Sequence, residues 1–234
     1  MQKASFMKKL SQGRYWVIVV VLLLLVTGCS STPPRQTQQT PTQSLAPPTP
    51  TITTPSPTVA ASSSATWSLL QQGDTGYVVM MRHALAPGTG DPPNFRLEDC
   101  STQRNLSAQG RAQARQIGEA FRRRGIKVSR VLSSQWCRCL ETARLLNLGP
   151  VKPFAPLNSF FRDRSAIARQ TTEVREFITA NRNTVGTIIL VTHQVNITAL
   201  TDIVPQSGES VVLRANEQDQ VEVIGRIESF RRDE

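Results

Sequence analysis

The chain has 234 residues, with 27 Lys and Arg against 17 Asp and Glu, a formal net charge of +10. This length fits one ordinary domain with additional segments. The basic excess favours anionic substrates or an anionic membrane surface, and the lack of a basic run interleaved with aromatic residues argues against a nucleic-acid-binding protein.

Residues 1–28 have the pattern of a bacterial lipoprotein signal peptide. A basic start precedes the apolar run Trp16–Val26, which falls short of the ~20 residues that a membrane-spanning helix needs. The VTGC that follows, Val26 to Cys29, resembles the lipobox, in which cleavage precedes the cysteine and the thiol receives a diacylglycerol. We therefore predict lipidation at Cys29 and a lipid-anchored, extracytoplasmic location in the cell envelope, on the periplasmic face of the outer membrane if the cell is Gram-negative.

Residues 29–66 are predicted to be the lipidated cysteine and a disordered tether. The segment 30–66 holds eight of the fifteen prolines among Thr, Ser and Gln, and it has too little apolar content to form a core. The remaining residues, 67–234, are enough for one folded domain.

Apolar runs that are short and rich in Val and Ile alternate with helical patterns along this domain. The predicted strands cover residues 77–81, 128–133, 150–156, 187–192, 211–214 and 221–227. The predicted helices cover residues 107–124, 134–146, 171–182 and 195–203, after a short helix or turn at 67–72. The last two strands are expected at the edge of the sheet. The alternation predicts an α/β fold, a three-layer α/β/α sandwich with a mainly parallel sheet.

Chemistry-bearing side chains stand where three predicted strands end. Arg82 and His83 close the first strand, Arg138 lies in the first turn of the helix after the second, and His193 follows the strand at 187–192. The carboxyl ends of parallel strands meet at one edge of a sheet, where α/β folds bind ligands. Two cations and two imidazoles converging there suit a phosphate group. The long loop 84–102 is expected to form a wall of this site.

Four segments in order resemble the histidine phosphatase superfamily, with the phosphoglycerate-mutase-like fold. They are MRHA around Arg82 and His83, QRNLSAQGRAQA (Gln103–Ala114), LSSQWCRCLETA (Leu132–Ala143) and LVTHQVNI (Leu190–Ile197). The resemblance implies that His83 is the nucleophile and forms a phosphohistidine that water hydrolyses. It also implies that Arg82, Arg138 and His193 bind the phosphate and stabilise transition-state charge. His193 is expected to act best when protonated, whereas His83 must attack through a neutral nitrogen.

The acid that protonates the leaving group is less clearly marked. The region that holds a glutamate in many relatives reads LNSFFRDR, from Leu157 to Arg164, and Asp163 is its only acid. An ion pair with a neighbouring arginine is an equally good interpretation of Asp163, and Asp91 and Glu209 are rival candidates.

Three cysteines remain after Cys29. Two of them are expected to pair in an oxidising compartment, either Cys100 with Cys137 or Cys100 with Cys139. Two cysteines and two distant histidines do not make a zinc site, so no metal and no cofactor are expected.

These features predict a membrane-anchored, extracytoplasmic, metal-independent phosphatase that hydrolyses a small phosphomonoester. Two alternatives stay open: a phosphohistidine-protein phosphatase, and a lipoprotein that binds phosphate or a phosphorylated ligand with little or no turnover. The partners expected are a small phosphorylated substrate and the membrane, without nucleic acid.

Overall fold

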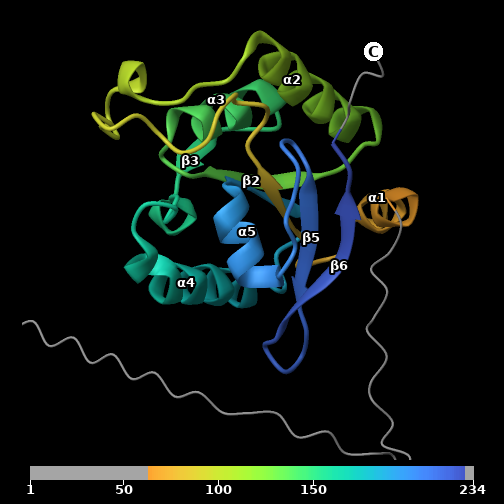
Figure 1. Ribbon diagram of the computed structural model, residues 1–234. Coiled ribbons are helices and arrows are strands. Elements are labelled where there is room, and N and C mark those ends of the chain that lie inside the picture. Colours follow the sequence, from red (N-terminus) through yellow and green to blue (C-terminus); the bar gives the residue numbers. More distant parts are fainter. Residues whose placement is uncertain (1–62, 230–234) are drawn as a thin grey trace, which may run out of the picture. The chain divides into compact units, whose positions relative to one another are not determined.

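A computed structural model describes residues 63–229 of the chain (Figure 1). The predicted signal peptide, Cys29 and most of the predicted tether lie outside the described residues. Between residues 63 and 229, no helix has both the length and the apolar character to cross a membrane.

Helices and strands alternate along the described chain as the sequence predicts. The helices are α1 (Ser63–Gln72), α2 (Ala108–Arg123), α3 (Cys137–Leu146), α4 (Ile167–Ala180) and α5 (Gln194–Thr201), with short 3-10 turns η1 (Cys100–Thr102), η2 (Ala155–Leu157) and η3 (Arg164–Ala166). The strands are β1 (Val78–Arg82), β2 (Val128–Ser133), β3 (Val151–Pro153), β4 (Thr187–Thr192), β5 (Ser210–Ala215) and β6 (Val221–Ile227).

The described strands form one sheet in the order β3-β2-β4-β1-β5-β6. The β3–β2, β2–β4 and β4–β1 pairs are parallel, and the β1–β5 and β5–β6 pairs are antiparallel. The first strand of the domain is therefore central. Its neighbour β4 is parallel and in register, with Arg82 opposite Thr192, so the residues that follow β1 and β4 emerge side by side.

Apolar side chains of the sheet alternate between two core layers. Val79 and Met81 of β1 pack in one cluster with residues of α2 and α3, whereas Val78 and Met80 pack in another with residues of α4 and α5. This is the two-residue period of a strand that is buried on both faces. Figure 1 shows α2 and α3 on one side of the sheet and α4 and α5 on the other. The predicted α/β fold with a mainly parallel sheet is confirmed.

Two predicted helix ends are confirmed in detail. The Ser107 side chain accepts from the Gly110 backbone N–H at the start of α2, as an N-cap does. Gly125 follows α2 with a φ of 66°, a left-handed conformation that glycine adopts without a steric penalty.

Some boundaries differ from the predictions. Helix α1 begins at Ser63, inside the predicted tether, and buries Thr66 against β6, where a Cβ on Gly225 would lie 2.1 Å from the Thr66 hydroxyl oxygen. The burial of a threonine carries no hydrophobic signal that would mark the start of the domain. Strand β5 was expected at the edge of the sheet but pairs on both sides, so β6 alone covers that edge.

Candidate active site

The carboxyl ends of β1 and β4 place the two histidines of the chain next to each other. The His83 backbone N–H donates to the Thr192 carbonyl oxygen at 2.9 Å, and the two imidazole centroids lie 5.6 Å apart. Both side chains are buried, with 2% of His83 and 3% of His193 exposed. The predicted convergence of His83 and His193 is what the structure shows.

Arg138 lies between the two imidazoles. It is the second residue of α3, and its guanidinium donates from Nε to His83 Nε2 at 3.2 Å and contacts His193 Nδ1 from Nη2 at 3.3 Å. The side chain is buried. A buried guanidinium that binds both imidazoles is placed to hold a group that reacts between them.

The hydrogen bonds of His83 identify its free nitrogen. Nδ1 lies 2.7 Å from the Ala84 carbonyl oxygen, which is only an acceptor, so Nδ1 carries the proton. Nε2 accepts from Arg138 Nε, so it is unprotonated and its lone pair is directed at that guanidinium, in a residue that lines the pocket. Burial, with a smaller contribution from the charge of Arg138, lowers the pKa of His83 to about 3. His83 is therefore a neutral imidazole with an unprotonated Nε2 at neutral pH.

His193 has the opposite arrangement. Its Nδ1 accepts from Arg138, and its Nε2 lies 2.8 Å from the Ser134 hydroxyl oxygen, to which it donates. Burial lowers the pKa of His193 well below its usual value, and the charge of Arg138 adds to this effect. The expectation of a protonated His193 thus differs from the ligand-free site, where the neutral form is favoured. A bound phosphate dianion would oppose both effects.

Arg82 supplies a second cation. Its Nη1 donates to the Pro205 carbonyl oxygen at 2.9 Å. Its Nε is buried, and no described residue accepts from it. A buried donor without a partner is costly unless a ligand accepts from it. The group of four residues predicted from sequence, Arg82, His83, Arg138 and His193, lines a single pocket.

Two further residues of this pocket were not predicted as binding residues. Arg104 donates from Nε to the Gly90 carbonyl oxygen at 2.7 Å and from Nη1 to the Ala86 carbonyl oxygen, and it lines the pocket. Asp91 forms an ion pair with Arg138. Arg104 could have been predicted from the sequence, because it stands just before Leu106 and Ser107 in the family-like segment Gln103–Ala114.

Asp163 is not brought to the pocket with the other four. Its side chain is exposed and caps η3, accepting from the Ser165 backbone N–H at 3.1 Å. The bonds from the Ser165 hydroxyl and backbone lower the pKa of Asp163, which favours the carboxylate over the acid. Glu209 is buried, but it pairs with Arg226 and accepts from the Gln206 backbone N–H.

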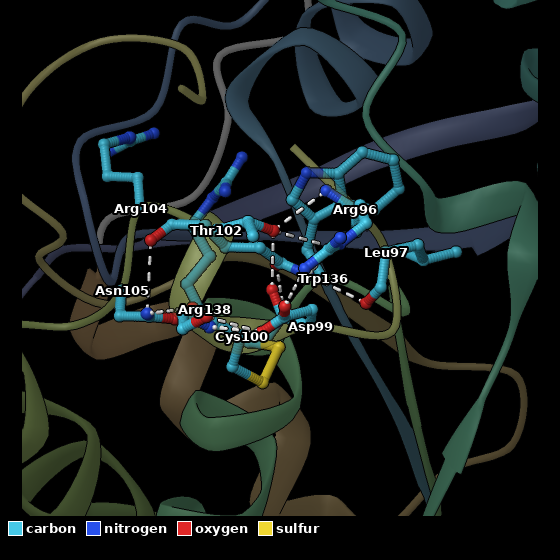
Figure 2. The surroundings of a disulfide bond; sticks show 12 residues. Arg96, Leu97, Asp99, Cys100, Thr102, Arg104, Asn105, Trp136 and Arg138 are labelled. Carbon is cyan, nitrogen blue, oxygen red and sulfur yellow. Dashed lines mark hydrogen bonds and ion pairs between the residues drawn. A yellow bond between two sulfur atoms is a disulfide. The ribbon is translucent and has the colours of Figure 1, made fainter. Parts of the chain in front are cut away.

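The cysteine pairing that the sequence left open is resolved. Cys100 of η1 is bonded to Cys137, the first residue of α3, and Cys139 is the free, buried cysteine of residues 63–229. Figure 2 shows that the bond joins the long loop to α3 beside Arg138. The disulfide thereby fixes the loop that carries Asp91 and Arg104 to the helix that carries Arg138.

Comparison with known proteins agrees with this arrangement. The sequence profile of the histidine phosphatase superfamily (branch 1) matches residues 78–158, which include Arg82, His83 and Arg138. A search of curated proteins found no match.

Among solved structures, the protein histidine phosphatase SixA in complex with tungstate is similar, with a TM-score of 0.50 at 14% identity over 65% of this chain and 96% of SixA. The product of the open reading frame Rv3214 of Mycobacterium tuberculosis is also similar, with a TM-score of 0.50 at 10% identity. The match covers 65% of this chain and 97% of the Rv3214 chain. At these identities the structural likeness shows the shared fold alone. The resemblance to the histidine phosphatase superfamily seen in the sequence is supported over residues 78–158 by the profile match.

Proposed function

We propose that the protein hydrolyses small phosphomonoesters through a phosphohistidine on His83. The observation that carries this proposal is the state of His83: a neutral imidazole with an unprotonated Nε2, in a pocket that Arg82, Arg104 and Arg138 also line. A phosphoryl group in this pocket would meet a nucleophile on one side and donors for its oxygens around it.

In the first half of the reaction, His83 Nε2 attacks phosphorus and the bond to the ester oxygen breaks. The proton stays on Nδ1 and is donated in a hydrogen bond to the Ala84 carbonyl oxygen, which stabilises the positive charge that develops on the ring. Arg138 and the free Nε of Arg82 stabilise the transferring oxygens, and His193 donates to the phosphoryl group once the dianion has raised its pKa. Water then attacks the phosphohistidine and releases inorganic phosphate.

The test is hydrolysis of p-nitrophenyl phosphate by the purified protein, its His83→Ala variant and its Asp163→Asn variant. Activity is expected for the parent protein and a loss of at least about a thousandfold for His83→Ala, because the covalent route needs this nitrogen. Acid quench with a ³²P-labelled substrate should trap an acid-labile phosphoryl group on the parent protein. Activity that survives His83→Ala would rule out the mechanism.

The same experiment separates the alternatives. Tight binding of phosphate without turnover on a broad panel of phosphoesters would favour a binding lipoprotein. Turnover restricted to a phosphohistidine-containing protein would favour a phosphohistidine-protein phosphatase.

We also propose that the protein is a lipid-anchored, extracytoplasmic member of its superfamily. Support comes from the signal-peptide pattern of residues 1–28 and from the Cys100–Cys137 disulfide, since such bonds persist in oxidising compartments. Labelling of cells with a radioactive fatty acid should mark the protein. The label should be lost in Cys29→Ser, and a labelled Cys29→Ser protein would refute the proposed site.

A further inference from the structure

Asp91 is the one acidic residue among those that line the active-site pocket in the described part of the chain. Its carboxylate is 7% exposed. Oδ1 accepts from Arg138 Nη1 at 2.6 Å, and Oδ2 accepts from Arg138 Nη2 at 3.2 Å and from Trp136 Nε1 at 3.1 Å. The Arg104 backbone N–H adds a longer bond of 3.3 Å. A buried carboxylate with this many donors is held in one place.

This contact uses the donors that a phosphoryl group needs. Arg138 directs Nε to His83, and both of its terminal nitrogens bond Asp91. The guanidinium has five N–H groups, and the contacts with His83, His193 and Asp91 use four of them. A phosphoryl group that binds both terminal nitrogens of Arg138 beside His83 therefore competes with Asp91 for them. Substrate binding is therefore an exchange of one anion for another on the same guanidinium.

The exchange changes the protonation of Asp91. In the free protein, burial opposes the charge of Asp91, but the hydrogen bonds and charge of Arg138 outweigh it and lower the pKa of this carboxyl. Once the phosphoryl dianion takes Arg138, Asp91 loses these bonds and gains a like charge nearby, and both changes raise its pKa. The other charged or titratable groups facing it are Arg82, Arg104, His83 and His193. The positive charges of Arg82 and Arg104 limit the rise in the pKa of Asp91, whereas the neutral imidazoles do not.

We propose that Asp91, released from Arg138 by the substrate phosphoryl group, is the proton donor for the leaving group. This inference rests on the proposed phosphohistidine reaction. The carboxyl proton passes to the ester oxygen as the His83 Nε2–P bond forms and the P–O bond breaks. The resulting carboxylate then takes a proton from the attacking water, as the new P–O bond forms and the P–N bond breaks. The cycle ends with a neutral His83 and a protonated Asp91, which ionises when phosphate leaves and Arg138 becomes free again.

The experiment compares Asp91→Asn with the parent protein on two substrates. Ethyl phosphate has a poor leaving group that needs a proton, and p-nitrophenyl phosphate has one that leaves unprotonated. We compare kcat/KM, which covers the steps up to release of the alcohol and excludes the later attack of water. It is expected to fall about a hundredfold or more for ethyl phosphate in Asp91→Asn, with a much smaller change for p-nitrophenyl phosphate. Glu98→Gln removes the same charge from an exposed position of the same loop and should change neither rate. An equal loss on both substrates would overturn the assignment.

Binding of inorganic phosphate tests the exchange without turnover. Asp91→Asn should bind phosphate more tightly than the parent protein in calorimetry, because no carboxylate competes for Arg138. Unchanged or weaker binding would show that Asp91 only orients Arg138. If the parent protein bound phosphate but hydrolysed neither ester, the proposed function would fail, and the binding comparison would still decide whether the two anions exchange.

A second cavity beside the pocket carries an independent inference about the substrate. It shares Phe161, Gln194 and Val195 with the active-site pocket. Its other apolar walls are Phe160 of the same segment as Phe161, Ile167 of α4 and Ala199 of α5. Phe161 is 50% exposed and is one of three large apolar side chains that are exposed between residues 63 and 229; the other two, Val185 and Val204, line neither cavity. The lining is mixed, since Arg164, Gln194 and Thr198 also belong to it, but five of its eight residues are apolar. An exposed aromatic ring between a phosphate pocket and this mainly apolar cavity fits a ligand that has both a phosphate and an apolar group.

We infer that this cavity binds an apolar group of the phosphomonoester, such as an alkyl or aryl chain. This inference also rests on the proposed function. The value of kcat/KM should rise from ethyl to hexyl phosphate, by up to about fourfold for each methylene that becomes buried. Ala199→Phe fills the cavity and should remove most of this preference, whereas Val185→Phe, which adds the same ring elsewhere, should keep it. Equal kcat/KM values for the two esters would overturn the inference. Binding of hexylphosphonate compared with ethylphosphonate applies the same test to a protein that does not turn over.

Discussion

His83 and His193 have opposite tautomers because each meets a different acceptor. The Ala84 carbonyl oxygen accepts a hydrogen bond from Nδ1–H of His83, and the Ser134 hydroxyl oxygen accepts one from Nε2–H of His193. Each remaining nitrogen accepts from Arg138, which holds one donor against each ring. The arrangement keeps one imidazole ready to attack and the other free to gain a proton at Nδ1 when an anion arrives.

This arrangement predicts the titration of both rings. Neither imidazole should titrate between pH 5.5 and 8 in the ligand-free protein, since burial and Arg138 lower both pKa values, that of His83 to about 3. Because the chain contains two histidines, ¹H–¹³C NMR of the ring carbons can follow each one, with His83→Asn for assignment. Added phosphate should raise the pKa of His193. A midpoint near 6.5 without ligand would contradict the described hydrogen bonds.

The sequence is sufficient to identify Arg82, His83, Arg138 and His193, because each stands next to a strand end whose place follows from apolar periodicity. It offers Asp91 only as one of three candidate acids, because the contact of Asp91 with Arg138 depends on the path of a loop that has no periodicity. The interpretation of Asp163 shows the same limit: its position in the chain matches the family pattern, but the described turn places its carboxylate at a 3-10 N-cap in solvent.

At the scale of the elements, α3 and the loop before α2 are held together by several contacts. The Cys100–Cys137 disulfide joins them, and the Cys137 backbone N–H donates to Gln103 Oε1 at 2.9 Å. Trp136 stacks on Phe95 of the loop, with ring centroids 5.1 Å apart. Strand and helix identities followed from the sequence, but the choice of Cys137 over Cys139 did not. That choice depends on which face of α3 meets the loop, and Cys139 lies buried against the Thr192 carbonyl oxygen instead.

Reduction of this disulfide should destabilise the protein. The bond spans 37 residues, for which the chain-entropy relation gives about 4 kcal/mol. We expect the denaturant midpoint to fall when a phosphine reductant is added, as measured by fluorescence. The double variant Cys100→Ser/Cys137→Ser should not respond to reductant, whereas Cys139→Ala should respond like the parent protein. Loss of the response in Cys139→Ala would mean that Cys139 takes part in the bond.

At the scale of the whole molecule, the buried histidines make stability depend on pH. His83 has a pKa of about 3 in the folded protein and 6.5 when exposed, so the unfolded chain binds more protons between these values. Stability is therefore fully present above about pH 6.5 and is lost as the pH falls toward 3. His193 acts in the same direction.

The free energy of unfolding should accordingly fall by up to about 1.4 kcal/mol per pH unit for each such histidine. Urea unfolding at pH 7, 6, 5 and 4 measures the slope. The double variant His83→Asn/His193→Asn should show a flatter dependence. A parent protein as stable at pH 4.5 as at pH 7 would contradict the burial of neutral imidazoles.

The position of β1 in the sheet has a consequence for how the protein is made. This strand leaves the ribosome before the other strands of the domain, yet its partners are the much later β4 and β5, with Val78 opposite Ile188 and Leu213. Contacts so distant in sequence form slowly and only after most of the chain exists. Until then, the apolar residues Val78–Met81 have no sheet neighbours and are available to chaperones or to other chains. His83, Arg138 and His193 therefore come together in one late step, and a truncated nascent chain carries His83 without the pocket that the three residues line.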